Sequence, residues 1–267
     1  MILASAPPLS LILSVLAAAA YAWPAARATR INERGARLWV ALAWLMHGAV
    51  LAITLLGDRP HFGFATAMSV TAWLVAAVYA VESQIFPQLP TRWTLCVVGT
   101  VAVLAGFFFP GGPMPATASA WLAVHLAFGV ACYGLFGIAV VHAWFMTRAE
   151  ARIRHAQDPH SGLPLLTLER LTYRFVGAGF VLLSATLLAG FLFSESLYGH
   201  GHAWRWDHKT VLSSLAWLTF AGLLVGRTFF GWRGRRAVHV LYLGAVLLLL
   251  AYVGSRFVLE IVLGRTP

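Results

Sequence analysis

The stretch LTYRFVGAGFVLLSATLLAGFLFS, residues 171–194, contains one charged side chain, Arg174. A helix of about 20 apolar residues crosses a hydrocarbon core of roughly 30 Å. Such runs recur along the chain, of which 60% is hydrophobic and 10% charged. Soluble domains carry about 25% charged residues, so the composition excludes a soluble globular protein. The sequence predicts an all-α polytopic membrane protein, because backbone groups in lipid must be hydrogen-bonded within their own segment.

Eight transmembrane helices are expected, within a single transmembrane domain that comprises residues 1–267. The predicted spans are Leu3–Trp23, Ala36–Leu56, Phe64–Val81, Trp93–Phe109, Ala118–Thr147, Leu171–Ser194, His208–Phe230 and Ala237–Leu263. The first span is interpreted as a retained helix, because no basic segment of the kind found in signal peptides precedes it. The long connection Arg148–Arg170 is polar and is expected to be a loop.

The basic residues gather in alternate connections. Most of the 19 Lys and Arg residues follow the first, third, fifth or seventh predicted span. The positive-inside rule places these connections in the cytoplasm and both termini on the periplasmic side of a bacterial inner membrane. The formal charge of +10 therefore indicates orientation in the lipid bilayer, and no nucleic acid partner is expected.

The outer loop Gly199–Lys209 combines Trp, His and charge between two apolar spans. Residues two apart in an extended segment face the same way, so Trp204 and Trp206 could form one platform for a planar macrocycle. Arg205 would then be free to pair with a carboxylate. The alternative is an interfacial aromatic belt, in which Trp gathers without a ligand. Asp207 stands where the seventh span starts and is expected to cap that helix, which would fix the angle of the loop.

Two of the histidines within predicted spans are candidates for haem ligation. His125 is near the outer end of the fifth span, and His47 is about halfway down the second. An ionisable residue inside a span indicates function, and a neutral imidazole is a good axial ligand for haem iron. The alternative for each is a helix–helix hydrogen bond to a Ser or a backbone carbonyl. Gly48, beside His47, would permit another helix to approach closely.

The remaining histidines are assigned by position. His142 lies ~25 Å along the helix from His125 and cannot bind the same iron. Both His142 and His239 are interpreted as boundary residues near cytoplasmic helix ends. The outer-side candidates for a second ligand are His61, His200, His202 and His208.

Other common chemistries are not supported by the sequence. Cys96 and Cys132 form no C-x-x-C motif, so neither thiol redox chemistry nor covalent haem attachment is expected. No nucleophile with a base, P-loop or dinucleotide-binding fingerprint is present, and the chain is not expected to be an enzyme. The basic run Gly231–Arg236 is interpreted as a topology anchor that also meets anionic lipid.

Together these features resemble the cytochrome c assembly family of CcsA-like, tryptophan-rich, haem-handling membrane proteins, over about residues 36–263. Trp204–Thr210 resembles the end of the family's periplasmic signature, a W-x-W-D-P-K-E type sequence, and Gly231–Arg236 continues the match in the same order. His125 with Cys132-Tyr133 is similar to the family's helix with a periplasmic His ahead of a Ser-Tyr or Ala-Tyr pair. His47 resembles an intramembrane His near the start of the family's core. The resemblance is closest to the small eight-span inner-membrane subgroup of proteobacteria.

The chain also departs from the family pattern. His208 stands in place of the signature Pro, and Thr210 in place of the acidic residue. The family's second periplasmic His has no counterpart in Leu247–Phe257, and its His before the basic run has none in Leu224–Arg227. The outer loop Asp58–Phe64 lacks the family's Asn and Glu. A two-His haem site of the family's kind therefore cannot be carried over intact.

The resemblance implies a haem-binding accessory protein of cytochrome c biogenesis that binds haem b without turnover, beside another cytochrome c assembly membrane subunit. Haem-binding roles are implied for His125, Trp204, Arg205, Trp206, Asp207 and His47. His125 would ligate the iron, and Arg205 or Lys209 would meet the propionates.

The alternative is a regulatory or scaffold membrane protein of tetrapyrrole synthesis without bound haem. Its function would then lie on the cytoplasmic segments Arg148–Arg174 and Gly231–Arg236. A transporter is not favoured, because the carboxylates Glu82, Glu195 and Glu260 all fall near span ends.

Overall fold

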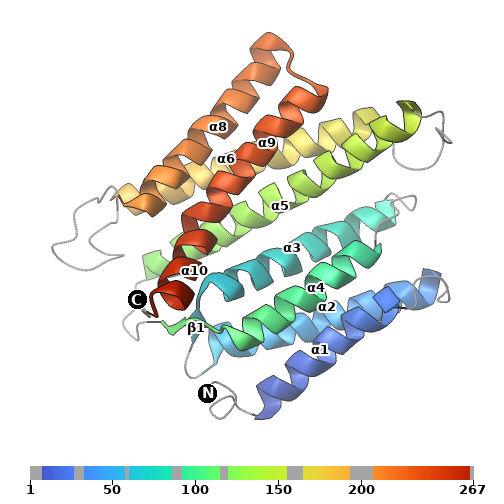
Figure 1. The fold of residues 1–267 in the computed structure, drawn as a ribbon, viewed down its shortest axis with the longest axis vertical. Coiled ribbons are helices and arrows are strands. Elements are labelled where there is room, and N and C mark those ends of the chain that lie inside the picture. The colour runs from blue at the N-terminus through green and yellow to red at the C-terminus, as the bar shows by residue number, and fades with distance from the viewer. Residues whose placement is uncertain are drawn as a thin grey trace. The chain divides into compact units, whose positions relative to one another are not determined.

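A computed structural model describes residues 8–26, 33–57, 60–85, 92–114, 120–154, 165–192 and 207–264. Within these ranges the chain is almost entirely helical (Figure 1). The elements are α1 (Pro8–Ala26), α2 (Glu33–Leu56), β1 (His61–Phe62), α3 (Phe64–Ile85), α4 (Arg92–Phe108), β2 (Gly112–Pro113), α5 (Ala120–Arg154), α6 (Leu165–Leu192), α8 (His208–Phe230), α9 (Gly234–Leu249), η2 (Leu250–Gly254), α10 (Ser255–Phe257) and η3 (Val258–Val262).

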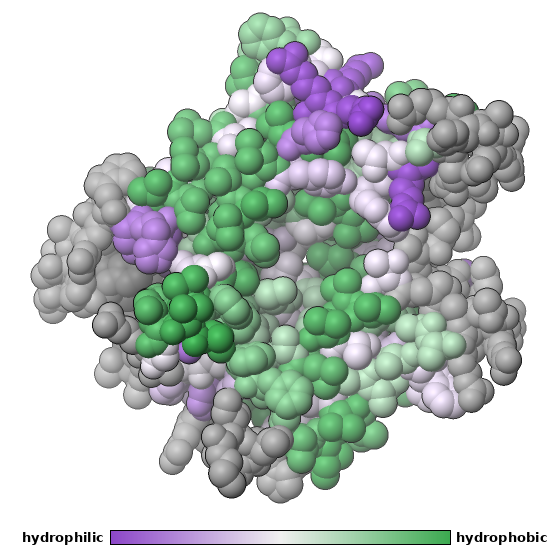
Figure 2. Space-filling model, viewed as in Figure 1, coloured by the Kyte–Doolittle hydropathy of each residue, from purple (hydrophilic) through white to green (hydrophobic). Residues whose placement is uncertain are grey.

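Seven apolar helical segments in the described part of the chain are long enough to cross a membrane. The prediction of an all-α polytopic membrane protein is thereby confirmed. The remaining predicted span corresponds to α4, which has 17 residues and is apolar over Thr94–Phe108. The count of eight spans stays a prediction. Figure 2 shows hydrophobic side chains spread over the visible face, as expected for helices whose solvent is lipid.

The loop between the fifth and sixth spans is shorter than the predicted Arg148–Arg170. Helix α5 continues to Arg154, and α6 begins at Leu165. The reason is intrinsic propensity, because the segment after Thr147 is rich in Ala, Arg and Glu, which are strong helix formers in water. Polarity marked the end of the apolar run, which is a different point from the end of the helix.

Two departures from regular α-helix occur in the described chain. Strands β1 and β2 pair in antiparallel register, with His61 opposite Pro113 and Phe62 opposite Gly112. The last predicted span is one continuous run of helix, but η2 and η3 within it are π-helical. A π turn widens the helix by one residue and is frequent at functional sites.

The described chain forms two compact units. The first unit contains α1, α2, α3 up to Val81, α4, the strand pair, and the chain from Arg256 onward. The second contains the end of α3, α5, α6, α8, α9 and the last span up to Ser255.

In the first unit, a pair of aromatic rings joins α2 to α3. Trp44 of α2 and Trp73 of α3 stack with their centroids 4.6 Å apart. Each indole N–H donates to the other residue's backbone carbonyl, at 3.1 and 3.0 Å. A Cβ at Gly48 would lie 3.1 Å from Trp73 Nε1, so this glycine does permit the close approach that the sequence suggested.

The second unit is built around two stacked phenyl rings. Phe136 of α5 and Phe220 of α8 are buried, with centroids 3.8 Å apart. Glycines from the other two helices make room for them: a Cβ at Gly179 of α6 would lie 3.1 Å from Phe136 Cζ, and one at Gly244 of α9 would lie 2.7 Å from Phe220 Cε1. Small residues at helix contacts let backbones approach closely in a membrane.

A tight turn joins α8 to α9. Gly231 and Gly234 have φ angles of +63° and +59°, a left-handed conformation that favours glycine. The backbone N–H of Trp232 donates to the Gly226 carbonyl at 3.0 Å, which folds the indole back onto α8 at Gly226. The turn therefore holds one aromatic ring in a defined place.

We predict that Gly226→Ala destabilises the protein, because a Cβ there would collide with the indole ring of Trp232. Overpacking of this kind costs about 1–3 kcal/mol. Gly222→Ala on the same helix is the matched control, since nothing lies within 4 Å of its Cβ position. Thermal unfolding in detergent should show a lower Tm for Gly226→Ala and an unchanged or slightly higher Tm for Gly222→Ala. Equal effects of the two changes would contradict the packing described.

Candidate functional site

His125 lies in the second turn of α5, where the ring is half-buried against α6. A Cβ at Gly190 would lie 3.5 Å from His125 Cε1, so the absence of a side chain at Gly190 brings the α6 backbone close to the ring. Its Nδ1 is buried and has no hydrogen-bond partner among the described residues. A buried imidazole nitrogen without a partner is unusual and points to a ligand.

Three further side chains gather at the same end of the second unit. Lys209, at the start of α8, is close enough for its charge to act on the His125 ring, and its Nζ lies 5.7 Å from the centroid of the Tyr252 ring. Tyr252 belongs to the π-helical segment η2. Tyr133, eight residues after His125 on α5, donates its hydroxyl to the carbonyl of Leu248. The site thus combines one imidazole, one cation and two phenol rings from three helical segments, α5, α8 and η2.

Asp207 is the N-cap of α8, as the sequence predicted. Its Oδ1 accepts a hydrogen bond from the Thr210 backbone N–H at 2.8 Å. Burial opposes ionisation of this carboxyl. The backbone N–H and hydroxyl of Thr210, together with the charges of Lys209 and His208, outweigh that effect and hold the pKa of Asp207 below its ordinary value. The cap anchors the start of α8 beside Lys209.

The other predicted residues of the outer loop, Trp204, Arg205 and Trp206, lie outside the described residues, as do His200 and His202. In the chain they come directly before Asp207. The loop is therefore attached to the helix end that carries Lys209.

His47 belongs to the first unit and is fully buried. Its Nε2 lies 2.8 Å from Ser69 Oγ on α3, and its Nδ1 lies 3.5 Å from the Tyr21 hydroxyl on α1. Both ring nitrogens therefore have protein partners. This arrangement matches the alternative weighed for His47, a hydrogen bond between helices, and leaves no free nitrogen for a metal.

The interpretation of His142 as a boundary residue is wrong. Its side chain is 1% exposed, and its Nε2 lies 2.7 Å from Oε2 of Glu82, whose side chain is 8% exposed. The Phe175 ring packs edge-on against the imidazole. A buried charge needs a partner, and pairing with Glu82 allows both residues to lie in the interior of the second unit. The sequence held a signal for such a pair: the fifth apolar run contains His142, and the third apolar run is followed directly by Glu82.

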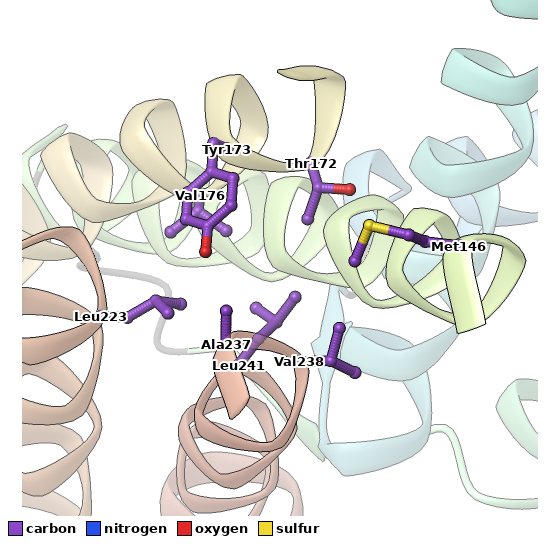
Figure 3. A pocket seen from close by; sticks show the side chains of 8 residues that line it. All are labelled: Met146, Thr172, Tyr173, Val176, Leu223, Ala237, Val238 and Leu241. Carbon is purple, nitrogen blue, oxygen red and sulfur yellow. The ribbon is translucent and has the colours of Figure 1, made fainter. Parts of the chain in front are cut away.

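A small pocket in the second unit lies among α5, α6, α8 and α9 (Figure 3). Its lining residues are Met146, Thr172, Tyr173, Val176, Leu223, Ala237, Val238 and Leu241. The volume is about 10 Å³, which is the size of one water molecule and far too small for a macrocycle. Its lining contains no histidine, so the pocket is unrelated to the His125 site.

The residues around His125 fit the demands of a haem group. A neutral imidazole with an unpartnered nitrogen can ligate iron, a lysine can pair with a propionate, and a phenol ring can lie against the macrocycle. Among the residues that the structure describes, no cluster of three or more His, Cys, Asp or Glu side chains could hold a bare metal ion.

Comparison with protein families gives a match to the family described as Cytochrome C assembly protein, over residues 36–263. Among curated proteins, a relative over almost the full length is the "Uncharacterized 28.8 kDa protein in nifR3-like 5'region" of Azospirillum brasilense. The two are 29% identical over 96% of this chain and 97% of that protein. No solved structure matches the chain.

Two further relatives match over part of the chain. Inner membrane protein YpjD of Escherichia coli (strain K12) is 32% identical over 52% of this chain and 52% of that protein. Cytochrome c biogenesis protein CcsA of Gloeobacter violaceus is 34% identical over 35% of this chain and 27% of that protein. The aligned region thus spans about half of YpjD and about a quarter of CcsA.

We predict that Asp207→Ala lowers stability at neutral pH by about 1 kcal/mol, because α8 loses its N-cap. The folded pKa is lowered, so the contribution of the carboxylate is present above the ordinary pKa and is lost as the pH falls through the lowered value. Thermal unfolding in detergent, followed from about pH 7 to about pH 3, should therefore show a gap between wild type and variant that closes on acidification. Asp207→Asn keeps a capping oxygen without the charge, and its gap to Asp207→Ala should stay constant. A wild-type advantage that persists undiminished in acid would refute this role.

Proposed function

The chain belongs to the cytochrome c assembly protein family, and from this premise we propose that it is a haem-binding accessory protein of cytochrome c biogenesis. Family membership and the CcsA relatives support a role in cytochrome c biogenesis. The apolar spans and the similarity to an inner membrane protein support a multi-pass location in the inner membrane. The more specific proposal, that the protein binds haem, rests on the His125 site.

The observation that carries the proposal is the unpartnered, buried Nδ1 of His125. His47 bonds through both ring nitrogens with Tyr21 and Ser69. His142 also has a buried, unpartnered Nδ1, but its side chain is 1% exposed and its Nε2 pairs with Glu82. His125 is half-buried near the start of α5, where the charge of Lys209 acts on it, and is therefore the histidine best placed to ligate iron.

The remaining residues would bind and orient the group. Lys209 would pair with a propionate, and Asp207 would hold the start of α8 so that Lys209 faces the imidazole. Trp204 and Trp206 would lie against the macrocycle, and Arg205 would meet the second propionate. When bound, haem b would supply a redox-active iron for delivery to an acceptor. The protein's own part is to bind the group, orient it and restrict access of water, which is binding without turnover.

The topology proposed with this function has eight spans, α4 included, in one transmembrane domain. Most basic residues then face the cytoplasm, and both termini and the start of α8 face the periplasm. A second cytochrome c assembly membrane subunit would complete the site, because the second axial ligand of the family's pattern has no counterpart in the last span.

The rival proposal is a regulatory or scaffold protein of tetrapyrrole synthesis without bound haem. The exposed arginines of the α8–α9 turn favour it, since they offer a charged surface on the side opposite to His125 along α8. The two proposals differ in which end of the second unit carries the function.

We expect purified wild-type protein in detergent to give a Soret band after haem addition, and His125→Ala to bind haem at least about tenfold more weakly, because the axial ligand is lost. Titration followed by visible spectroscopy measures both. His239→Ala is the matched control, since His239 is exposed on α9 and should leave the band unchanged. A clean wild-type protein without a Soret band after haem addition would end the haem proposal.

In cells, Trp204→Ala with Trp206→Ala should reduce the yield of mature cytochrome c, because the proposed platform for the macrocycle is removed. Haem staining of membranes, set against the amount of the variant protein in the same membranes, gives the readout. Trp23→Ala controls for the loss of a surface tryptophan, since Trp23 is 46% exposed on α1. Normal cytochrome c in the double variant would favour the regulatory rival.

A further inference from the structure

The turn between α8 and α9 carries an unusual surface, which we call the basic turn and define as Phe229–Arg236. Phe229 and Phe230 end α8 with 80% and 73% of their surfaces exposed. Arg235 and Arg236 follow within a few residues and are also exposed. Figure 2 shows strongly hydrophilic side chains over the end of the α8–α9 hairpin with hydrophobic ones beside them.

The arginines at this end of the second unit fall into two groups. Arg227 pairs with Glu169, and Nε of Arg233 lies 3.7 Å from the same carboxylate. Arg235 and Arg236 pair with no carboxylate among the described residues. The first group connects α8 and the start of α9 to α6, and the second has no salt bridge among the described residues.

The structure fixes the position of one of these charges. The guanidinium of Arg236 lies 4.4 Å from the centroid of the Trp232 ring, and that ring is packed on Gly226. A guanidinium stacked on an aromatic ring keeps its N–H donors at the ring's edge free for an anion. The Trp232 ring therefore holds the Arg236 guanidinium in a defined position, unlike the side chains of a solvated run of lysines.

The local field also favours an anion. The first turn of α9 contains Arg235 and Arg236 and no acidic residue, and the N-cap Arg233 makes no side-chain capping bond. Positive side chains at a helix N-terminus are unfavourable, because the helix dipole is positive there. One carboxylate of α5 is also near, since Glu150 Oε1 lies 3.8 Å from the Cβ position of Gly234. A bound anion would offset the repulsion that remains and pair with both guanidinium groups.

We propose that the basic turn binds an anionic phospholipid, with the phosphate on Arg235 and Arg236 and the acyl chains against Phe229 and Phe230. The phosphate suits the planar donors of arginine. The exposed phenyl rings at the same turn as the cations favour an amphipathic ligand over a free phosphate or an acidic soluble protein. Lipid also surrounds this helix end already, because α8 and α9 belong to membrane spans. The proposal is independent of haem binding, which uses the opposite end of α8.

The test compares native mass spectrometry of the wild type with that of Arg235→Gln/Arg236→Gln, both purified in detergent and mixed with phosphatidylglycerol or phosphatidylcholine. Wild type should retain phosphatidylglycerol in preference to phosphatidylcholine. The double variant should bind phosphatidylglycerol on the order of tenfold more weakly, since each basic residue near a lipid headgroup contributes to binding. Equal retention of phosphatidylglycerol by the two proteins would overturn the proposal.

Two further variants separate this site from general surface charge. Arg148→Gln removes an arginine that also stacks on a tryptophan, with its Cζ 4.5 Å from the Trp144 centroid, and should leave the preference intact. Arg236→Lys keeps the charge and should retain most of the binding.

Competition with inorganic phosphate distinguishes the ligand source: a lipid site keeps its phosphatidylglycerol, and displacement of that lipid by millimolar phosphate would contradict the proposal. Loss of preference in Arg148→Gln equal to that in the double variant would contradict it as well.

Discussion

Close packing between helices is the constraint on which the second unit depends. In lipid no hydrophobic force draws helices together, so van der Waals contact must hold them. The stacked rings of Phe136 and Phe220 fit because Gly179 and Gly244 leave space for them. α5, α6, α8 and α9 therefore meet around one buried pair of rings. The directions of these four helices then decide which residues lie together at each end of the unit.

The two ends of α8 carry different chemistry as a consequence. At its start, the cap Asp207 and the cation Lys209 lie near His125 of α5, where Gly190 allows α6 to approach. At its end, the turn to α9 exposes arginines and phenyl rings. The first end suits a ligand with a metal and carboxylates, and the second suits an amphipathic anion. Neither site requires a catalytic group.

The sequence predicted the parts that depend on one segment at a time. Apolar runs located the helices, because lipid imposes helix on each run separately, and Asp207 was identified as a cap from its position alone. Pairings between segments could not be predicted. The bond of His142 to Glu82 joins residues 60 positions apart, and the unpartnered nitrogen of His125 depends on how α6 packs beside it. The end of α5 was missed because a helix that leaves the membrane continues on propensity, without an apolar signal.

We propose that His125 ligates haem iron, and chemical rescue of a variant without this imidazole is the decisive test. In the variant His125→Gly the imidazole side chain is replaced by space at the same place on α5. Added imidazole should restore the Soret band and the axial-nitrogen signature of the iron to His125→Gly, and should not alter the spectrum of His239→Gly. Haem binding by His125→Gly that equals wild type without added imidazole would contradict the claim, because the iron would then take its ligand from another residue.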